Sequence, residues 1–364
     1  MQFHYGSKSF QIHRYPATSQ RSLRAWSAAD EHILNHLEAL EVADKQIAIY
    51  HDRFGFLACT LAERSPLSIV TFKSQAKAIT QNLQTNNLSY DAEAMLGPLA
   101  KVEQKVDIGI MKVPKALDLF RLYLHQLSSL LSEDGQVICA FMTRHFSPQL
   151  LKLAERYFTN VRQSRAYKKS RLLLLSGKKT LPDTPVLQQI AFAGHEALQT
   201  YPGVFAGKSV DMATRFLLEN LILREEDKKI LDLGCGYGVI AKAIYKINPL
   251  RELHLMDDNA LAIASAKLNL GGSNIHFHYE DSLTAVEDPK FDFVVSNPPF
   301  HFEHENNIEI PLKLFAEVKE SLNPEGHFQL VANHHLNYKT HLGKMFRRVK
   351  TVAENKKFVV YDCH

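Results

Sequence analysis

The feature that most constrains the fold of this sequence is an internal repeat. Three pairs of segments match in the same order, and the first two pairs are separated by 183 and 185 residues. Each match is weak alone, but three in one order at a nearly constant spacing predict a duplicated domain. A length of 364 residues is comfortable for two domains. The matching pairs are Ile47–Ala58 with Ile230–Ala241, Val106–Lys115 with Phe291–Phe300, and the segment starting at Leu131 with the one starting at Leu322.

Short apolar runs alternate with helical patterns in each half. This alternation predicts a mostly parallel sheet with helices on both faces, and such sheets bind ligands at the carboxyl ends of their strands. We therefore expect α/β domains over residues 1–180 and 201–364, joined by a linker at 181–200 that includes part of the Pro- and Lys-rich stretch Lys178–Pro185. In the second half the expected strands are Lys229–Leu233, Glu252–Met256, Asn274–Tyr279, Phe291–Ser296 and His327–Asn333, with a helix at Ala260–Asn269.

Composition argues against several classes of protein. No window approaches 18 consecutive apolar residues, so a membrane span is not expected. The first residues, MQFHYGSKSF, include polar and charged residues where a secretion signal would need an apolar stretch. The four cysteines (Cys59, Cys139, Cys235 and Cys363) form no Cys-x-x-Cys pair, which argues against a zinc ribbon or a disulfide framework. We expect a soluble protein of the reducing cytoplasm.

The positive charge is concentrated at the junction between the halves. The net charge is only +4, yet residues 151–180 contain nine Lys or Arg against one acidic residue, Glu155. One interpretation is a solvated strand and linker. The other is a strip that contacts phosphate groups, with Arg165, Lys168 and Lys169 as candidates. The sequence leaves both open.

A glycine-rich segment after the first strand of the second half predicts a small-molecule site. It reads DLGCGYG from Asp232 to Gly238 and opens a helix. Gly234 and Gly236 allow a tight turn and a close approach to a ligand, while the helix N-terminus offers free N–H groups. A dinucleotide-binding loop would need a third glycine where this chain has Val239. S-adenosylmethionine has no pyrophosphate, so it tolerates an acid such as Asp232 at the strand end.

Acidic residues follow the next two strands, in register with the glycine-rich segment. Asp257 ends the second strand, where a carboxylate can accept hydrogen bonds from both ribose hydroxyls. The adjacent Asp258 could share or replace it. Asp281, followed by Ser282, comes after the third strand, where it could accept from the adenine amino group.

The most specific motif is SNPPF, from Ser296 to Phe300, after the fourth strand. Its two prolines stiffen the backbone and leave carbonyl groups free to accept. The side-chain oxygen of Asn297 and the carbonyl of Pro298 can then accept hydrogen bonds from an exocyclic –NH2, while Phe300 offers a face for a planar base or amide. Such a site orients the nitrogen lone pair toward a methyl donor, without a metal or a covalent intermediate.

Histidine-rich segments give weaker signals. His304-Glu305 would begin a metalloprotease His-Glu-x-x-His motif, but its last position is Ile308. His334 and His335 are better explained as substrate-loop or structural residues. We therefore expect no metal, and no Ser-His-Asp arrangement is recognisable.

The first half lacks the residues that carry the chemistry. The segment His51–Gly55 has one glycine where the second half has three, and Ile69–Ala76 contains no acid. Lys112-Val-Pro-Lys115 stands where the second half has Asn-Pro-Pro-Phe. The first half should therefore keep the fold without the chemistry, and Lys112 and Lys115 indicate either a phosphate-contacting surface or simple drift.

The pairing of a degenerate and an intact copy resembles the bacterial tandem-domain rRNA guanine-N2 methyltransferases. The segments Pro202–Phe205 (PGVF), DLGCGYGVIA, SNPPF and Val331–Leu336 (VANHHL) are similar to both the small-subunit and the large-subunit enzymes. Arg14–Leu37 and Tyr50–Glu63 look specifically like the large-subunit, 23S rRNA enzymes. The resemblance covers nearly the whole chain. It implies two tandem Rossmann-like class I methyltransferase domains, the N-terminal one degenerate.

The resemblance also implies an activity: methyl transfer from S-adenosylmethionine to N2 of one guanine in 23S rRNA. We expect the enzyme to act as a monomer, since two fused domains make dimerisation unnecessary. One departure is that Asp258-Asn259 follows Asp257 where relatives often have Glu-Ser or Val-Ser, which leaves open which acid binds the ribose. The implied target site is Asn297, Pro298, Pro299 and Phe300. The implied cofactor site is Phe205, Asp232, Gly234, Gly236, Gly238, Asp257, Asp258, Asp281, Ser282 and Asn297.

Three alternatives stay open on the sequence. The first is the same reaction on 16S rRNA, against which the N-terminal sequence argues. The second is methylation of a protein glutamine or of adenine N6, since both present a planar amine to such a pocket. The third is a non-enzymatic RNA-binding or assembly factor that retains the fold, against which the intact glycine-rich segment and Asn297–Phe300 argue.

Overall fold

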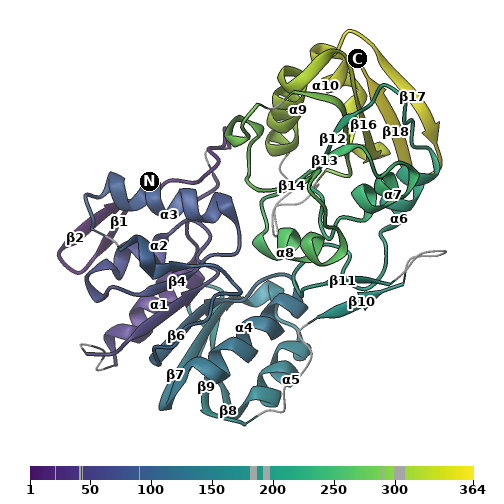
Figure 1. The fold of residues 1–364 in the computed structure, drawn as a ribbon. Helices are drawn as coiled ribbons and strands as arrows, with labels where there is room; N and C mark the ends of the chain where they lie inside the picture. The colour runs from purple at the N-terminus through teal and green to yellow at the C-terminus, as the bar shows by residue number, and fades with distance from the viewer. Residues whose placement is uncertain are drawn as a thin grey trace. The chain divides into compact units, whose positions relative to one another are not determined.

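The computed structural model of the chain divides into two compact units, Met1–Val186 and Leu187–His364 (Figure 1). The structure describes residues 1–20, 22–40, 42, 44–89, 91–180, 187–191, 197–288, 290–298 and 308–364. Among these residues, none of the helices has the length and apolar character needed to cross a membrane.

The second unit is built on a seven-stranded sheet of order β14-β13-β12-β15-β16-β18-β17. The five strands from β14 to β16 run parallel, and β18 and β17 complete the sheet in antiparallel pairs. Each expected strand is present, with β13 and β16 longer and β14 shorter than expected. Their bounds are β12 (Lys229–Leu233), β13 (Glu252–Asp257), β14 (Ile275–Tyr279), β15 (Phe291–Ser296), β16 (Leu322–Asn333), β17 (Val349–Glu354) and β18 (Phe358–Cys363).

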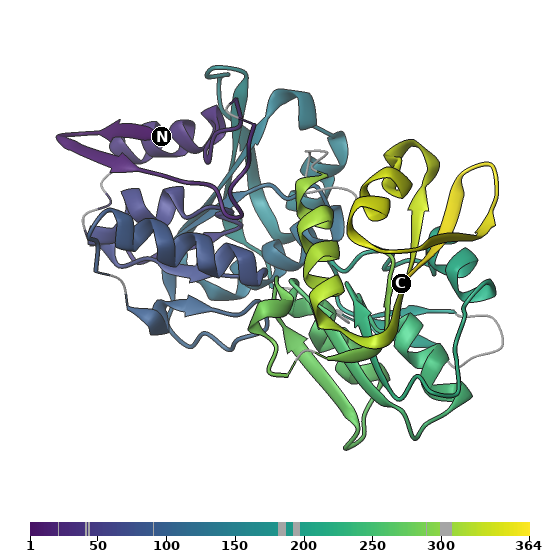
Figure 2. The same cartoon turned by 90° about the horizontal axis from the view of Figure 1, so that it is seen from above.

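Helices cover both faces of this sheet, as the alternating pattern predicts (Figure 2). Right-handed crossovers place α7 and α8 on one face and α9 and α10 on the other. On the second face, Phe315 of α9 and Leu342 of α10 pack into one apolar core with Leu231, Val294 and Phe328 of the sheet. The helices are α6 (Met212–Glu219), α7 (Val239–Ile247), α8 (Ala260–Asn269), α9 (Glu309–Ser321) and α10 (Tyr338–Met345).

Part of the range expected as a linker is ordered in the second unit. Strands β10 (Gln188–Ile190) and β11 (Leu198–Thr200) form an antiparallel pair. The side chain of Asn269, at the end of α8, bonds the backbone N–H and C=O of Gln199. These bonds attach β11 to the second unit.

The first unit repeats this architecture, with the order β5-β4-β3-β6-β7-β9-β8. Position for position this is the order of the second sheet, which confirms the duplication inferred from the repeat. Its elements are β1 (Gln2–Tyr5), β2 (Lys8–Gln11), α1 (Ala28–Glu38), β3 (Ile47–Tyr50), α2 (Phe56–Thr60), β4 (Leu67–Ile69), α3 (Lys73–Thr85), β5 (Met95–Leu96), β6 (Val106–Lys112), α4 (Leu117–Leu130), β7 (Leu131–Met142), α5 (Pro148–Tyr157), β8 (Phe158–Gln163) and β9 (Ser170–Lys178).

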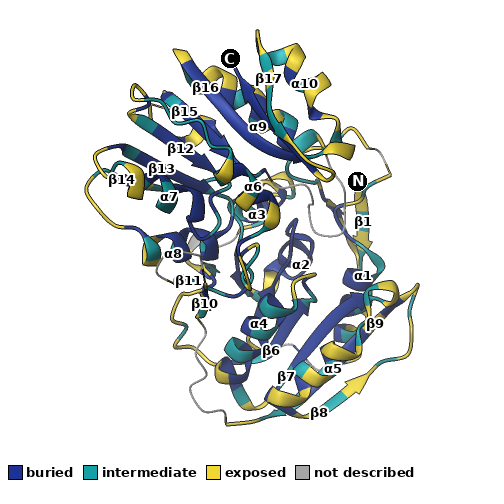
Figure 3. Ribbon diagram, turned by 90° about the vertical axis from the view of Figure 1, so that its right-hand side faces the viewer, coloured by how far each residue is buried: buried dark blue, intermediate teal, exposed yellow. Residues whose placement is uncertain are grey.

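The central strands of both sheets are buried on both faces (Figure 3). Every residue of β3 is buried, and β15 is buried except at Asp292. The central strands therefore read as largely continuous apolar runs rather than alternating ones, because a parallel sheet with helices on both faces exposes neither side.

One buried polar cluster lies among these apolar strands. The ring of His327 on β16 contacts Asp362 of β18 through Nδ1 (2.7 Å) and Asp227 through Nε2 (3.3 Å), and all three residues are buried. Burial alone would lower the pKa of His327, but the bonds to Asp227 and Asp362 outweigh it and raise that pKa above its ordinary value.

This raised pKa predicts that stability falls as pH rises. The contribution of the imidazolium is fully present below its ordinary pKa of about 6.5 and is lost as pH rises through the raised value. Glutamine at position 327 can donate a hydrogen bond but does not titrate. The Tm of the wild type should therefore fall by about 2–4 °C more than that of His327→Gln between about pH 6 and pH 9. An equal fall in Tm for the two proteins over this pH range would show that another group causes the pH dependence.

Candidate functional site

The sequence-predicted site residues meet at one edge of the second sheet. Strands β14, β13, β12 and β15 are neighbours and parallel, so their carboxyl ends lie side by side. The glycine-rich segment follows β12, Asp257 ends β13, Asp281 follows β14 and Asn297 follows β15. The structure therefore brings the predicted cofactor residues and the predicted target residue to the same edge.

The glycine-rich loop needs its glycines. Gly234, Gly236 and Gly238 have φ values of 71°, 55° and 81°, a region that other residues adopt only with strain. A Cβ on Gly238 would also lie 3.2 Å from side-chain atoms of Leu255 and Leu270. The sequence therefore fixes the path of this loop.

Asp257 ties the end of β13 to this loop. Its carboxylate accepts hydrogen bonds from the N–H groups of Gly236 and Asn259, both at 2.9 Å. Burial raises the pKa of Asp257 to about 6. Because that value lies below neutrality, the group is ionised at neutral pH and can accept further hydrogen bonds.

The Pro202–Phe205 segment lies against the loop. The Asn259 side chain donates to the carbonyl of Gly203 (3.1 Å), and a Cβ on Gly236 would lie 4.0 Å from Val204. The side chain of Phe205 is 68% exposed, which leaves it available to cover a bound molecule.

Asp232 is buried beneath the loop. One carboxylate oxygen accepts from the N–H of Ala241 in α7 (3.0 Å), and burial raises the pKa of Asp232 to about 7. In the first unit, Asp52 accepts in the same way from Ala58, the repeat equivalent of Ala241 (2.8 Å). Since this contact is also present in the half that keeps only one of the three glycines, it supports the fold. Contact of Asp232 with the cofactor remains a prediction.

Asn297 is held in one orientation. Its Nδ2 donates to Asp211 Oδ2 (3.2 Å) and lies 2.9 Å from Thr214 Oγ1. A carboxylate only accepts, so the amide nitrogen must face Asp211 and the amide oxygen must face away. This oxygen, Oδ1, is buried and has no hydrogen-bond partner among the described residues. Pro299 and Phe300 lie outside the described residues.

Two partners of Asn297 were not predicted. Asp211 is the N-cap of α6, where its carboxylate also accepts from the N–H groups of Ala213 and Thr214. The signal in the sequence is an acidic residue directly before a helical pattern, which marks a helix start rather than a site. The link to Asn297 spans 86 residues and appears only in the fold.

The two predicted residues after β14, Asp281 and Ser282, have different surroundings. Asp281 is partly exposed at the edge of the sheet. The hydroxyl of Ser282 is buried and donates to Glu317 Oε2 on α9 (2.9 Å), so it holds the loop to that helix. Cofactor contacts by these two residues remain predictions.

The predicted phosphate-contacting residues lie in the first unit. Lys112 forms an ion pair with buried Asp30 (2.9 Å) and Lys168 forms one with Glu31 (2.8 Å). The other three candidates are exposed; they are Lys115, Arg165 and Lys169.

The residues at the sheet edge fit S-adenosylmethionine and a planar amine. The glycine loop provides a cradle that a Cβ at Gly238 would disturb, Asp257 offers an ionised acceptor beside it, and Asn297 Oδ1 is a buried acceptor without a described partner. An unsatisfied buried acceptor costs free energy, so its presence indicates a donor that binds there.

Comparisons with known proteins support this assignment. Residues 1–180 match the RLMG N-terminal domain and residues 196–362 match the methyltransferase small domain. Proteins named ribosomal RNA large subunit methyltransferase G are 32% identical in Photobacterium profundum (98% of this chain, 97% of that protein) and 30% identical in Vibrio parahaemolyticus (97% and 94%). The solved 16S rRNA N2 methyltransferase of T. Thermophilus, in complex with AdoMet and guanosine, has a TM-score of 0.76 at 20% identity, over 100% of this chain and 97% of that one. This last likeness shows a shared tandem fold.

Proposed function

Because this chain belongs to the ribosomal RNA large subunit methyltransferase G family, we propose that it methylates the exocyclic N2 of a specific guanine in 23S rRNA. The observation that carries the proposal is Oδ1 of Asn297 at the carboxyl edge of the second sheet, a buried acceptor with no hydrogen-bond partner among the described residues. Guanine N2 is an exocyclic –NH2 group and matches this acceptor. We expect the enzyme to act as a monomer in the cytoplasm.

The site residues act by orientation. S-adenosylmethionine, when bound, supplies an electrophilic methyl group. Asn297 Oδ1 accepts one N2–H and directs the nitrogen lone pair out of the plane of the base, with the carbonyl of Pro298 as the expected second acceptor. Both hydrogen bonds strengthen as the nitrogen gains positive charge in the transition state. A paired guanine cannot present N2 in this way, so the base must be unpaired or flipped out.

The turn between β8 and β9 supports RNA contact by the first unit. Tyr167 and Ser170 exchange backbone hydrogen bonds across a two-residue turn formed by Lys168 and Lys169, whose φ values are 44° and 64°. Such turns favour Asn-Gly, because left-handed backbone costs other residues about 1–2 kcal/mol each. Two lysines at this strained position indicate a functional role.

Replacing Lys168-Lys169 with Asn-Gly should therefore separate stability from RNA affinity. The variant should melt about 2–4 °C higher, because the turn is relaxed. It should bind rRNA more weakly, and the slope of log affinity against log salt should shrink by about 1–2, as expected for one or two lost phosphate contacts. The matched control Lys101→Asn removes an exposed lysine outside the positively charged segment 151–180 and should retain the affinity for rRNA. Unchanged RNA affinity in the turn variant would show that these lysines have a structural role only.

The proposed reaction is tested with labelled cofactor on unmodified 16S and 23S rRNA, followed by nucleoside analysis. N2-methylguanosine in 23S rRNA alone is the expected result. Label in 16S rRNA alone would show that the same reaction takes place on the RNA of the small subunit. Cofactor binding without label in either RNA would contradict the rRNA substrate and point to another planar amine, such as a protein glutamine.

A further inference from the structure

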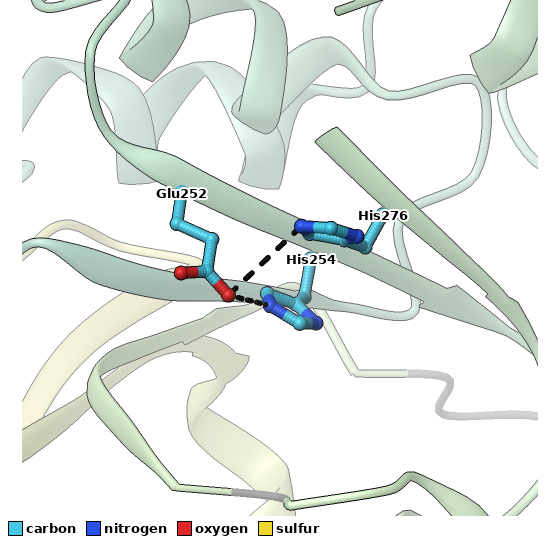
Figure 4. Close-up of side chains that lie close together, drawn as sticks. All are labelled: Glu252, His254 and His276. Atoms are coloured by element: carbon cyan, nitrogen blue, oxygen red, sulfur yellow. Dashed lines mark hydrogen bonds and ion pairs between the residues drawn. The ribbon is translucent and has the colours of Figure 1, made fainter. Parts of the chain in front are cut away.

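A second group of polar side chains lies away from the methyl-transfer edge. Glu252 and His254 are on β13 and His276 is on β14, directly paired with His254 in the strand register. Residues two apart on a strand share a face, as do directly paired residues. The three side chains therefore project from the same face of the sheet and converge (Figure 4).

The distances within the group suit a metal ion. Glu252 Oε1 lies 2.7 Å from His254 Nε2 and 3.9 Å from His276 Nε2. Each of the three residues offers one ligand atom that lies within 4.8 Å of the other two. Ligand atoms of tetrahedral Zn²⁺ lie about 3.3 Å apart, given metal–ligand bonds of about 2.0–2.1 Å. The distances from Glu252 Oε1 to the two imidazole nitrogens, 2.7 and 3.9 Å, lie on either side of that value.

A neighbouring histidine can orient the group for metal binding. In this structure His254 Nε2 donates to Glu252 Oε1 (2.7 Å), because a carboxylate only accepts, and Nδ1 accepts from His278 Nε2 (2.8 Å). Metal binding would displace the Nε2 proton and place the ring proton on Nδ1, with His278 Nε2 as its acceptor. A hydrogen bond of this kind commonly fixes the tautomer of a metal-binding histidine. Lys229 is the competing cation: its Nζ lies 3.8 Å from Glu252 Oε1, and it is also held by Asp288 (3.5 Å).

The group is separate from the cofactor residues. His254 precedes Asp257 by three residues, which is about 10 Å along a strand and places the two side chains on opposite faces. His276 is 44% exposed, whereas His254 is 8% exposed, so a bound ion would lie at the surface and keep one position open to water.

From this geometry we propose that Glu252, His254 and His276 form a Zn²⁺ site with three protein ligands and one water. Two imidazoles and a carboxylate are a ligand set that zinc accepts in proteins. Because the ligands come from neighbouring strands, the ion would join β13 to the edge strand β14. The expected role is to stabilise the second unit.

The test is zinc binding to the full-length protein without a histidine tag. Equilibrium dialysis should give one Zn²⁺ per chain, and Zn²⁺ at a hundredfold excess over its Kd should raise the Tm of the second unit by about 5–10 °C. Co²⁺ in the same site should give the visible absorption bands of a tetrahedral complex. A protein that binds no zinc, or binds it without a defined stoichiometry, would overturn the proposal.

Variants locate the ion. His276→Gln changes a half-exposed side chain and Glu252→Gln is nearly isosteric, so both should fold, and each should weaken zinc binding at least tenfold. His335→Gln, which removes an exposed histidine elsewhere in the second unit, is the matched control and should bind zinc as the wild type does. Equal loss in the control, or full retention in both ligand variants, would place the ion elsewhere and contradict the assignment.

Discussion

Replacing Asn297 with alanine is expected to lower the rate of methyl transfer about 10²–10³-fold, the loss typical for removal of one preorganised hydrogen bond to a developing charge. The reason is the fixed orientation of the amide: its nitrogen is held by Asp211 and Thr214, so its oxygen is directed to the incoming amine. The measurement is single-turnover methylation of unmodified 23S rRNA with labelled S-adenosylmethionine. Cofactor affinity, measured in parallel by calorimetry, shows whether Asn297 also contacts the cofactor, as the resemblance implies.

Two further variants distinguish orientation from mere presence of an oxygen. Asn297→Asp keeps an acceptor but places a carboxylate against that of Asp211, which should displace it and abolish activity. Thr214→Val removes only one support of the amide and should cost about tenfold in rate with cofactor affinity unchanged. Wild-type activity in Asn297→Ala would show that the motif has no role in the reaction. Another residue would then have to accept the hydrogen bond from the amine.

Contiguous motifs made much of this architecture predictable. The runs KILDL at Lys229–Leu233 and FDFVVS at Phe291–Ser296 are mostly apolar and almost wholly buried, as expected of central parallel strands, and their bounds match the structure. The three glycines between Asp232 and Gly238 require a backbone that few other residues adopt. Local chemistry therefore determined both the strands and the loop.

Contacts between distant residues could not be predicted in this way. Asp211 reaches Asn297 across 86 residues, and His254 meets His276 only because β13 and β14 pair in one register. A shift of one residue in that register would send the second histidine to the opposite face. In the first unit, Asp52 supports the helix amide although its position in the repeat is not that of Asp232. An alignment of the two motifs misses this equivalence, because the hydrogen bond from a carboxylate to the helix is retained while the carboxylate comes from a different position of the repeat.

Asp257 and Asp258, between which the sequence could not choose, should contribute very differently to cofactor binding. Asp257→Ala is expected to weaken binding of S-adenosylmethionine about 10²–10⁴-fold, since two hydrogen bonds to a charged group contribute about 3–6 kcal/mol together. Its carboxylate is fixed by the N–H groups of Gly236 and Asn259, beside the glycine loop. Asp258→Ala should cost less than about fivefold. Calorimetric titration of each purified variant with the cofactor measures both effects.

Asp257→Asn removes the charge and one of the two acceptors that hold the loop. The amide oxygen can accept from the N–H of Gly236, but the –NH2 group cannot accept from the N–H of Asn259, so the Tm of the variant must be measured beside its cofactor affinity to show whether the loop is retained. Because the pKa of Asp257 is raised to about 6, wild-type affinity should also fall as pH drops below that value, whereas the affinity of Asp257→Asn should not. A larger loss in Asp258→Ala than in Asp257→Ala would reverse the assignment: Asp258 would bind the ribose, and Asp257 would serve only to hold the loop in place.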